Sequence, residues 1–298
     1  MSGQIDFRRL ARSIADEKGY AAILPVLEKE LLHYEILRAL DNARLLERLV
    51  FQGGTSLRLC YGSERFSEDL GFAGGGDFDG SLMLVIKDAI EAAIVERYDV
   101  EVTVKEPKRR QFEQAYPSSQ GVSVDCWQIR VITQQGRPDI PQQKIKLEVA
   151  GVPAHTRVIR PLINNYSELP YGYANILVLV ESIEEIVVDK LFALSTASYT
   201  RYRDIWDLRW LSVHPQFEKT RLRELMEKKI KDYHFKGDFR QTASELLERL
   251  PDLVNGAEFM ALMSRFLPTQ TIDATLNRAL FRTHLAEVIH ELYDFVLR

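Results

Sequence analysis

The chain has 298 residues, of which 46% are hydrophobic, so it can bury a core in one large domain or two modest ones. Its formal net charge is -4, which excludes an overall basic field that would draw it onto nucleic acid, so any such binding has to be local. Cys60 and Cys126 lack CxxC spacing and suit a reducing compartment. With no signal-peptide pattern and no apolar run long enough for a bilayer, we expect a soluble, cytoplasmic protein.

The first clear periodicity lies between residues 20 and 50, where apolar side chains recur at helical spacing: Leu24, Leu27, Leu31, Tyr34, Leu37 and Leu40. This pattern predicts one or two amphipathic helices against a core. The following segment, LVFQGGTSLRLCYG, has an apolar stretch that stops at Gly53 and Gly54. It predicts a strand, a tight turn and a short helix capped by Thr55 or Ser56.

The segment RFSEDLGF alternates apolar and polar residues, which predicts a strand with Asp69 and Gly71 on one face. A helical pattern over 82–98 precedes three strand candidates, VEVTVKE, SVDCWQIRVITQ and QKIKLEVAGV. From Ser182 the chain turns helical up to a final helix, whose core-facing side ends on Phe295 or Val296. We therefore expect an α+β (mixed α/β) fold, with a mixed-sheet core and a mainly helical C-terminal half.

Three groups of residues fit phosphate chemistry, which needs donors around the phosphates and carboxylates that hold Mg²⁺. The first is the run Gly53-Gly54-Thr55-Ser56, because glycines let a phosphate approach the backbone and the following helix offers free N–H groups. Taken alone, such a run more often makes only a turn and a helix cap. A P-loop is excluded, since GxxxxGK[ST] is absent.

The second group is Asp69 with Glu148, which could face each other across a sheet and bind a metal. Strand alternation puts Lys144, Lys146 and Glu148 on one face, and Lys146 is the better placed to neutralise phosphate. The alternative is that Asp69 only ends a strand and Glu148 is an exposed alternating residue.

The third group is Lys190 with Asp204 and Asp207. The two aspartates are one helical turn apart, so they share a face and could orient Lys190 or a nucleotide. The alternative is a surface salt bridge of little energetic value.

Four segments follow one another along the chain: FQGGTSLRLCYGSERFSEDLGF, KIKLEV, SIEEIVVDKLFAL and YRDIWDL. In these segments and their order, the sequence resembles the AbiEii/MenT family of nucleotidyltransferase toxins, of the DNA polymerase β-type superfamily. The family has four ordered motifs: GG[ST] followed by D-x-D, K-x-[DE]-hydrophobic, an acidic residue leading to a lysine, and D-x-x-D. The resemblance runs from about residue 20 to 210. Together with the change to helical patterns, it leads us to expect a nucleotidyltransferase core with N-terminal helices over 1–195 and a helical domain over 196–298 packed on it.

The resemblance also implies transfer of NMP from an NTP to RNA, with the tRNA 3′ end among the acceptors, assisted by Mg²⁺ or Mn²⁺. Such enzymes are toxins of toxin–antitoxin or abortive-infection phage-defence systems, restrained by a cognate antitoxin. Carried over by position, the implied catalytic residues are Asp69, Glu148, Lys190 and Asp207, and Asp69 and Glu148 bind the metal. The implied nucleotide-binding residues are Gly53, Gly54, Thr55, Ser56, Arg65, Ser67, Lys146 and Asp204.

One position departs from the family: D-x-D is Asp69-Leu70-Gly71 here, so the second acidic ligand is missing. Losing one electrostatic catalytic group is expected to cost about 3 kcal/mol or more, so activity should be impaired. Asp77 and Asp79 follow a glycine-rich bend and are poor substitutes. Gly71 is either an acquired or engineered change that removes toxicity, which we favour because glycine packs nothing in a strand, or a natural divergence.

Two basic clusters are candidate contacts for RNA phosphates: Lys105, Lys108, Arg109 and Arg110, and then Arg221, Arg223, Lys228, Lys229 and Lys231 near Tyr233. The second cluster is more simply a solvated helix face. Rival functions are a non-catalytic nucleotide- or RNA-binding member of the fold, a small-molecule nucleotidyltransferase, and a metal-dependent nuclease that uses Asp69 with Glu148. The histidines show no metal-ligand spacing.

Overall fold

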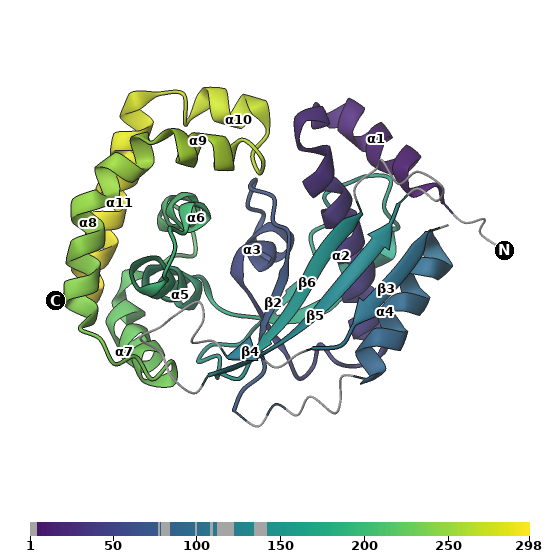
Figure 1. The fold of residues 1–298 in the computed structure, drawn as a ribbon, viewed down its shortest axis with the longest axis horizontal. Helices are drawn as coiled ribbons and strands as arrows, with labels where there is room; N and C mark the ends of the chain where they lie inside the picture. The colour runs from purple at the N-terminus through teal and green to yellow at the C-terminus, as the bar shows by residue number, and fades with distance from the viewer. Residues whose placement is uncertain are drawn as a thin grey trace. The chain divides into compact units, whose positions relative to one another are not determined.

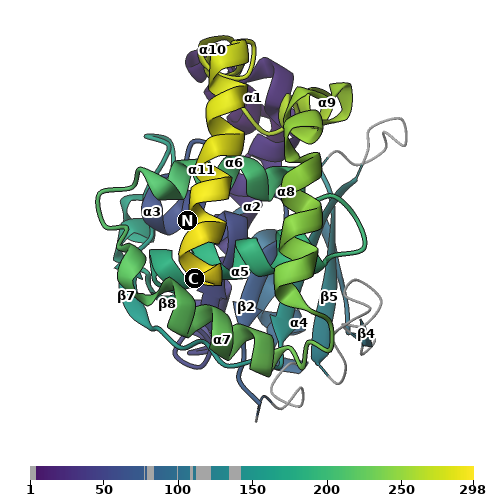
Figure 2. The same cartoon turned by 90° about the vertical axis from the view of Figure 1, so that its left-hand side faces the viewer.

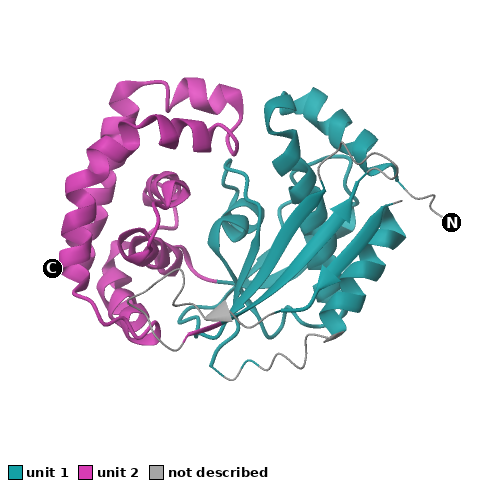
Figure 3. Ribbon diagram, in the orientation of Figure 1, with its two compact units in different colours: residues 1–110, 124–180 teal, residues 111–123, 181–298 magenta. Residues whose placement is uncertain are grey.

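The structure is a computed structural model that describes residues 5–76, 78, 84–98, 100–107, 110–111, 122–133 and 142–298. The chain divides into two compact units, Met1–Arg110 with Val124–Val180 (unit 1) and Gln111–Ser123 with Glu181–Arg298 (unit 2), which Figure 3 colours separately. Unit 1 carries a mixed sheet and unit 2 carries helices, so the predicted α+β class is confirmed. The division into domains at 1–195 and 196–298 stays a prediction.

The sheet has the strand order β3-β5-β6-β2-β1-β8-β7, and β4 also pairs with β5 (Figure 1). The strands are β1 (Val50–Gln52), β2 (Leu70–Ala73), β3 (Glu101–Lys105), β4 (Arg110–Gln111), β5 (Ser123–Ile132), β6 (Gln143–Ala150), β7 (Val158–Pro161) and β8 (Leu177–Val180). The β2–β6 and β1–β8 pairs are parallel, whereas β1–β2, β3–β5, β5–β6 and β7–β8 are antiparallel. Strands far apart in the sequence, β2 and β6, are therefore direct neighbours.

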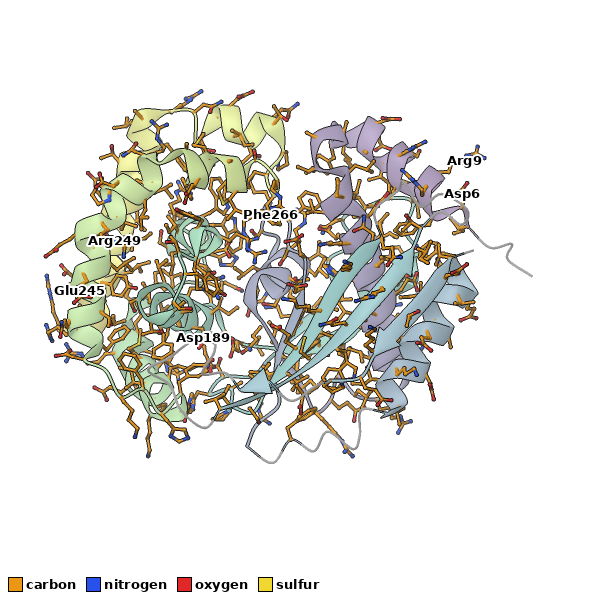
Figure 4. All side chains as sticks on the ribbon, viewed as in Figure 1. Asp6, Arg9, Asp189, Glu245, Arg249 and Phe266 are labelled. Carbon is orange, nitrogen blue, oxygen red and sulfur yellow. The ribbon has the colours of Figure 1, made fainter. Side chains whose placement is uncertain are left out.

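The helices of unit 1 are α1 (Phe7–Lys18), η1 (Ala21–Ile23), α2 (Leu24–Asn42), α3 (Gly53–Tyr61), α4 (Leu84–Arg97) and η4 (Tyr171–Asn175). Helix α1 begins after Asp6, whose Oδ1 accepts the Arg9 N–H at 3.0 Å, a helix cap labelled in Figure 4. It ends at Gly19, which adopts the left-handed conformation with φ 71°. Helices α2 and α4 pack on each other, α2 also contacts β6, and α4 contacts β3.

Helix α2 confirms the predicted leucine pattern but is buried on more of its surface than an amphipathic helix would be. Glu28, Glu30, His33 and Glu35 are buried along with the leucines. Their polar groups are paired: Glu30, for example, accepts hydrogen bonds from Arg58 at 2.9 Å and Tyr166 at 2.7 Å. Because a buried carboxylate is tolerated when it is paired, these acids do not prevent α2 from forming the centre of unit 1.

Unit 2 contains α5 (Ile183–Thr196), α6 (Tyr202–Ser212), η5 (Lys219–Arg221), α7 (Leu222–Asp232), α8 (Phe239–Asn255), α9 (Ala257–Met263), α10 (Thr269–Ala274) and α11 (Ala279–Leu297). Helix α11 packs against α6, α7 and α8, and Figure 2 shows α8 and α11 side by side. Val296 is 7% exposed and Phe295 is 42% exposed, so the core-facing position is Val296. Across the described residues, every helix is too short or too polar to cross a membrane.

Candidate functional site

The glycine pair lies where β1 passes directly into α3, and each glycine is needed for a different reason. Gly53 has φ 80°, a left-handed conformation that disfavours other residues. Gly54 is limited by space, because an added Cβ would collide with the Arg65 guanidinium and lie 3.1 Å from Ser67 Oγ. The chain at Gly54 is thus in close contact with two polar groups from the loop that follows α3.

The hydroxyls of Thr55 and Ser56 lie inside the first turn of α3, so the predicted capping role is wrong. The N-cap residue is Gln52, and its side chain makes no capping hydrogen bond. Ser56 Oγ donates to the Gly53 carbonyl at 2.8 Å, and Thr55 Oγ1 donates to the Asp69 carbonyl. The first turn of α3 therefore keeps its N–H groups free of a side-chain cap, which is the arrangement that binds anions.

Arg65 and Ser67 are both buried beside this helix end, at 2% and 8% exposure. Arg65 Nη1 donates to the Phe66 carbonyl at 2.6 Å, and its guanidinium also lies against Gly54. A guanidinium near the positive end of a helix dipole adds to the attraction for an anion. The sequence placed Arg65 on a strand, whereas it lies in a loop, because β2 begins only at Leu70.

Glu68 and Asp69 are held just before β2 by contacts to three different elements. Its Oδ1 accepts the backbone N–H of Lys146 on β6 at 2.9 Å, and its carbonyl accepts the Thr55 hydroxyl of α3. The preceding carbonyl, of Glu68, is hydrogen-bonded to His33 Nε2 of α2 at 3.0 Å. A carbonyl only accepts, so this ring nitrogen carries the hydrogen, and burial lowers the pKa of His33 below its ordinary value.

A second contact secures the same loop, because Lys29 Nζ of α2 lies 2.6 Å from Glu68 Oε1. Glu68 thus points to α2 through both its side chain and its carbonyl. The predicted strand over Arg65–Asp69 is wrong, since these residues are fixed by tertiary contacts to α2 and α3 and not by a ladder. The carboxylate of Asp69 nevertheless reaches β6, the strand that carries Glu148.

Gly71 lies directly beside Glu148 in the parallel β2–β6 ladder, and beside Gln52 in the β1–β2 ladder. Neighbouring strands are about 4.8 Å apart, so a side chain at position 71 would stand next to the Glu148 side chain. An added Cβ at Gly71 would lie 3.5 Å from the Gln52 carbonyl oxygen, an ordinary contact, and its φ is outside the left-handed region. The backbone therefore has room for an aspartate at this position.

Strand β6 alternates as predicted, with Lys144 and Lys146 exposed, Glu148 half-buried, and Ile145 and Leu147 buried on the other side. The shared face of residues 144, 146 and 148 is therefore confirmed. Asp69 joins this face through the Lys146 N–H. The Asp69 carboxylate thus contacts the same stretch of β6 that carries Lys146 and Glu148.

Lys190, Asp204 and Asp207 come together within unit 2. Lys190 Nζ lies 2.7 Å from Asp204 Oδ1 and 2.7 Å from Asp207 Oδ2, and all three side chains are buried. The surface salt bridge considered from the sequence is therefore wrong. Burial alone would raise the pKa of Asp204, but the Arg201 guanidinium and the Lys190 ammonium hold it below its ordinary range.

Unit 2 contains a second buried charge cluster, which the sequence patterns did not predict. Lys229 Nζ lies 2.7 Å from Glu185 Oε1, 2.9 Å from Asp189 Oδ1 and 3.2 Å from Glu181 Oε1. Lys229 and the two glutamates are fully buried, and Asp189 of α5 is labelled in Figure 4. Burial and the nearby Asp189 raise the pKa of Glu181, whereas for Lys229 the acids outweigh burial and raise its pKa.

The predicted basic cluster on α7 is corrected by this finding. Lys229 faces the interior, and Tyr233 is buried with its ring stacked on Phe192 at 4.9 Å between centroids, so it offers no surface for a base. Arg221, Arg223 and Lys231 are exposed, as a solvated helix face would be. Lys108, Arg109, Asp77 and Asp79 lie outside the described residues.

The carboxylates of this site that would hold a divalent ion are Asp69 and Glu148. Among the described residues, no group of three His, Cys, Asp or Glu side chains is gathered for a metal. Mg²⁺ in proteins is commonly bound by one or two carboxylates together with substrate phosphate oxygens. Asp69 and Glu148 meet that requirement, and Gly71 marks where a third carboxylate would stand.

The sequence matches the protein-family model described as nucleotidyl transferase AbiEii toxin, type IV TA system, over residues 35–282. Among solved structures, MenT4, a nucleotidyltransferase toxin from Mycobacterium tuberculosis H37Rv, shares the fold. The two chains are 17% identical with a TM-score of 0.56, over 95% of this chain and 98% of that one.

Two Helicobacter pylori structures are also similar. One, described as a nucleotidyltransferase, is 23% identical with a TM-score of 0.44, over 89% of this chain and 95% of its own. The other, JHP933, is 21% identical with a TM-score of 0.41, over 91% of this chain and 90% of its own. No curated protein matches the sequence. Because the family match spans residues 35–282, the chain belongs to the AbiEii nucleotidyltransferase toxin family of type IV toxin–antitoxin systems.

Proposed function

We propose that this protein transfers a nucleoside monophosphate from an NTP to RNA, with Mg²⁺ or Mn²⁺, and that Gly71 impairs the transfer. The observation that carries the proposal is the fixed position of Asp69 between the glycine turn and β6. Its carbonyl binds Thr55 of the turn, and its carboxylate binds the backbone of Lys146, two residues from Glu148. A phosphate-binding helix end and two carboxylates are thereby linked through one residue.

The triphosphate would be bound by the uncapped first turn of α3. Gly53 and Gly54 leave the backbone open to phosphate oxygens, and Arg65 and Ser67 lie against Gly54. Lys146, whose backbone N–H anchors Asp69, adds positive charge on β6 through its ammonium group. These groups favour the negative charge of a triphosphate without any contact to the base, so they do not select the nucleotide.

In the transfer itself, the acceptor hydroxyl oxygen forms a bond to the α-phosphorus while the bond to the bridging oxygen breaks and pyrophosphate leaves. Glu148 takes up the proton of the hydroxyl, and Asp69 with Glu148 would hold the metal. When bound, such an ion neutralises phosphate charge and lowers the pKa of the attacking hydroxyl. An aspartate at position 71 would add a ligand beside Glu148.

We propose that Lys190, Asp204 and Asp207, which the family resemblance assigns to catalysis and nucleotide binding, act as one cluster within unit 2. Each is buried, and the lysine is within 2.7 Å of both aspartates. Breaking a buried ion pair on one side costs about 3–5 kcal/mol, so the cluster fixes the relation of α5 to α6. Family membership implies an antitoxin as the counterpart of this toxin. We propose the cytoplasm as its location, tRNA ends as its acceptor and phage defence as its context.

The test uses α-labelled NTPs, Mg²⁺ or Mn²⁺ and total RNA with wild-type protein, Gly71→Asp and Gly71→Asn. The asparagine variant is the matched control, because it has the same size without the charge. We expect label on RNA with Gly71→Asp at about a hundredfold or more above wild type, and little gain with Gly71→Asn. Growth inhibition should follow the same order. An inert Gly71→Asp protein would refute the proposal.

A non-catalytic nucleotide-binding role is the second candidate, and the missing carboxylate at Gly71 favours it. In that case Gly71→Asp would bind NTP without transferring it. Equilibrium binding of a labelled NTP, measured beside the transfer assay, separates the two functions.

A further inference from the structure

One face of the sheet carries cations in two rows that run across β3, β5 and β6. In the first row, Lys105 pairs with Gln128 and Gln128 with Lys146. In the second row, Thr103 pairs with Arg130 and Arg130 with Lys144. Paired residues of neighbouring strands point to the same side of a sheet, so these side chains share one face, which we call the basic sheet face.

The opposite side of these strands is the core. Val104, Ile129, Ile145 and Leu147 are buried at 2% exposure or less, and α2 and α4 contact β6 and β3 of the same unit. On the basic sheet face, Lys105, Lys144 and Lys146 are exposed and Arg130 is half-buried. Figure 1 shows the three strands side by side. Strand alternation therefore separates an apolar core side from a cationic side.

The basic sheet face also carries two acids, Glu101 on β3 and Glu148 on β6, and the four cations outnumber them. Within the described part of the chain, these four cations, Lys105, Arg130, Lys144 and Lys146, form no ion pair with a carboxylate at 4.0 Å or less. Like charges directly opposite each other, such as Arg130 and Lys144, destabilise a sheet. The whole chain has a net charge of -4, so this concentration of positive charge is local. Such a cluster points to an anionic ligand.

The face reaches further than a nucleoside triphosphate site needs. It begins at Glu148, and each step of two residues along β6, to Lys146 and then to Lys144, is about 6.6 Å. Lys144 is therefore about 13 Å along the strand from Glu148, and Lys105 and Arg130 lie on strands further out. The rows hold Thr103 and Gln128 but no aromatic residue. Contacts here would go to a backbone and would not involve base stacking.

We propose that the basic sheet face binds the phosphodiester backbone of a single-stranded RNA acceptor, so that its terminal hydroxyl is presented to Glu148. The inference rests on the proposed function and adds the path of the acceptor. Phosphate contacts position a strand without reading its sequence, and their strength falls with salt.

The test compares two variants with the same loss of charge. Lys105→Gln/Arg130→Gln/Lys144→Gln removes cations from the face and leaves Lys146 in place. Arg221→Gln/Arg223→Gln/Lys231→Gln removes three exposed cations near or on α7 of unit 2. Affinity for a fluorescent oligouridylate is measured over a series of salt concentrations, with labelled NTP binding measured on the same proteins.

For the sheet variant we expect RNA affinity to fall at least about tenfold at low salt, and the slope of log affinity against log salt to flatten by about 2. NTP affinity should stay within about twofold, and the α7 variant should behave as wild type. Equal RNA affinity in the sheet variant, or an equal loss in the α7 variant, overturns the inference. Transfer of label to protein and not to RNA also overturns it.

A failure of the RNA-binding surface can be distinguished from a failure of the proposed transfer reaction. If Gly71→Asp never transfers a nucleotide but only the sheet variant loses RNA affinity, the RNA-binding surface is supported and the proposed transfer reaction is refuted. If Gly71→Asp labels RNA, and adding the three sheet substitutions changes neither the labelling nor the RNA affinity, the transfer reaction is supported and the RNA-binding surface is refuted.

Discussion

The charged residues of unit 1 and those of unit 2 are held in different ways. Asp69 and Glu148 are half-buried, and Asp69 is fixed through hydrogen bonds to the backbone of Lys146 and the hydroxyl of Thr55. In unit 2, Lys190 and Lys229 are buried and surrounded by carboxylates at 2.7–3.2 Å. Charges fixed by neutral groups keep their charge for a ligand, whereas charges neutralised by one another stabilise an architecture.

The largest effect is expected at the cluster of Lys229. Lys229→Met should lower the free energy of unfolding by about 3–5 kcal/mol near neutral pH, because it leaves three carboxylates together in the interior. Lys228→Met, which removes a more exposed lysine from the same helix, is the control and should have little effect. Denaturant unfolding measures both.

The pH dependence of the same variant sharpens the comparison. Glu181 and Asp189 have pKa values raised by burial in the folded protein, so protonating them favours the folded state. The stability that Lys229→Met loses should therefore be partly recovered as pH falls from 7 towards 5. A deficit that stays constant over this range would show that the missing cation is not the cause.

A smaller effect of opposite pH dependence is expected at Asp204. Its pKa is held below the ordinary range, so the ionised carboxylate stabilises the fold above about pH 4 and this contribution is lost as pH falls. Asp204→Asn should be destabilised by about 2 kcal/mol at pH 7, and the difference from wild type should shrink in acid. Unfolding curves at several pH values check this, and a difference that widens in acid would contradict it.

The smallest effect on stability is expected at His33, which supports the loop before Asp69. His33→Leu leaves the Glu68 carbonyl without its donor and should cost about 1 kcal/mol of stability. In the Gly71→Asp background it should also lower kcat of transfer, since Asp69 loses part of its support. His33→Gln can still donate a hydrogen bond and should restore much of kcat. An equal loss of kcat in the His33→Leu and His33→Gln variants would show that His33 acts through packing alone.

Much of the fold follows from sequence periodicity, and the exceptions have physical causes. Helix α2 and the alternation of β6 were predicted because both patterns are set by burial on a regular element. The alternation over RFSEDLGF indicated a strand from its beginning, yet Phe66 is buried by tertiary contacts, including the Arg58 guanidinium 4.3 Å from its ring centroid. The ladder therefore starts only at Leu70.

Only part of the site could be predicted from the sequence, for related reasons. The sequence placed Glu148 on a strand and the glycine pair between a strand and a helix correctly, but it put Asp69 on a strand that begins only at Leu70. Lys229 stands in the charged run EKKIKD, which resembles a solvated helix face, so its burial could not be anticipated. The one available signal was its spacing, since it falls at helical intervals from the buried Leu222, Leu225 and Met226. The support from His33 depends on a contact between residues 35 positions apart.

The central claim is that unit 1 holds a nucleotide-transfer site lacking one carboxylate. It is tested most directly by the rate of label transfer from α-labelled NTP to RNA by Gly71→Asp, relative to wild type and Gly71→Asn. The room for a Cβ at position 71 and its pairing with Glu148 predict a gain of about a hundredfold or more for aspartate alone. Folded Gly71→Asp protein with no more transfer than wild type would contradict the account.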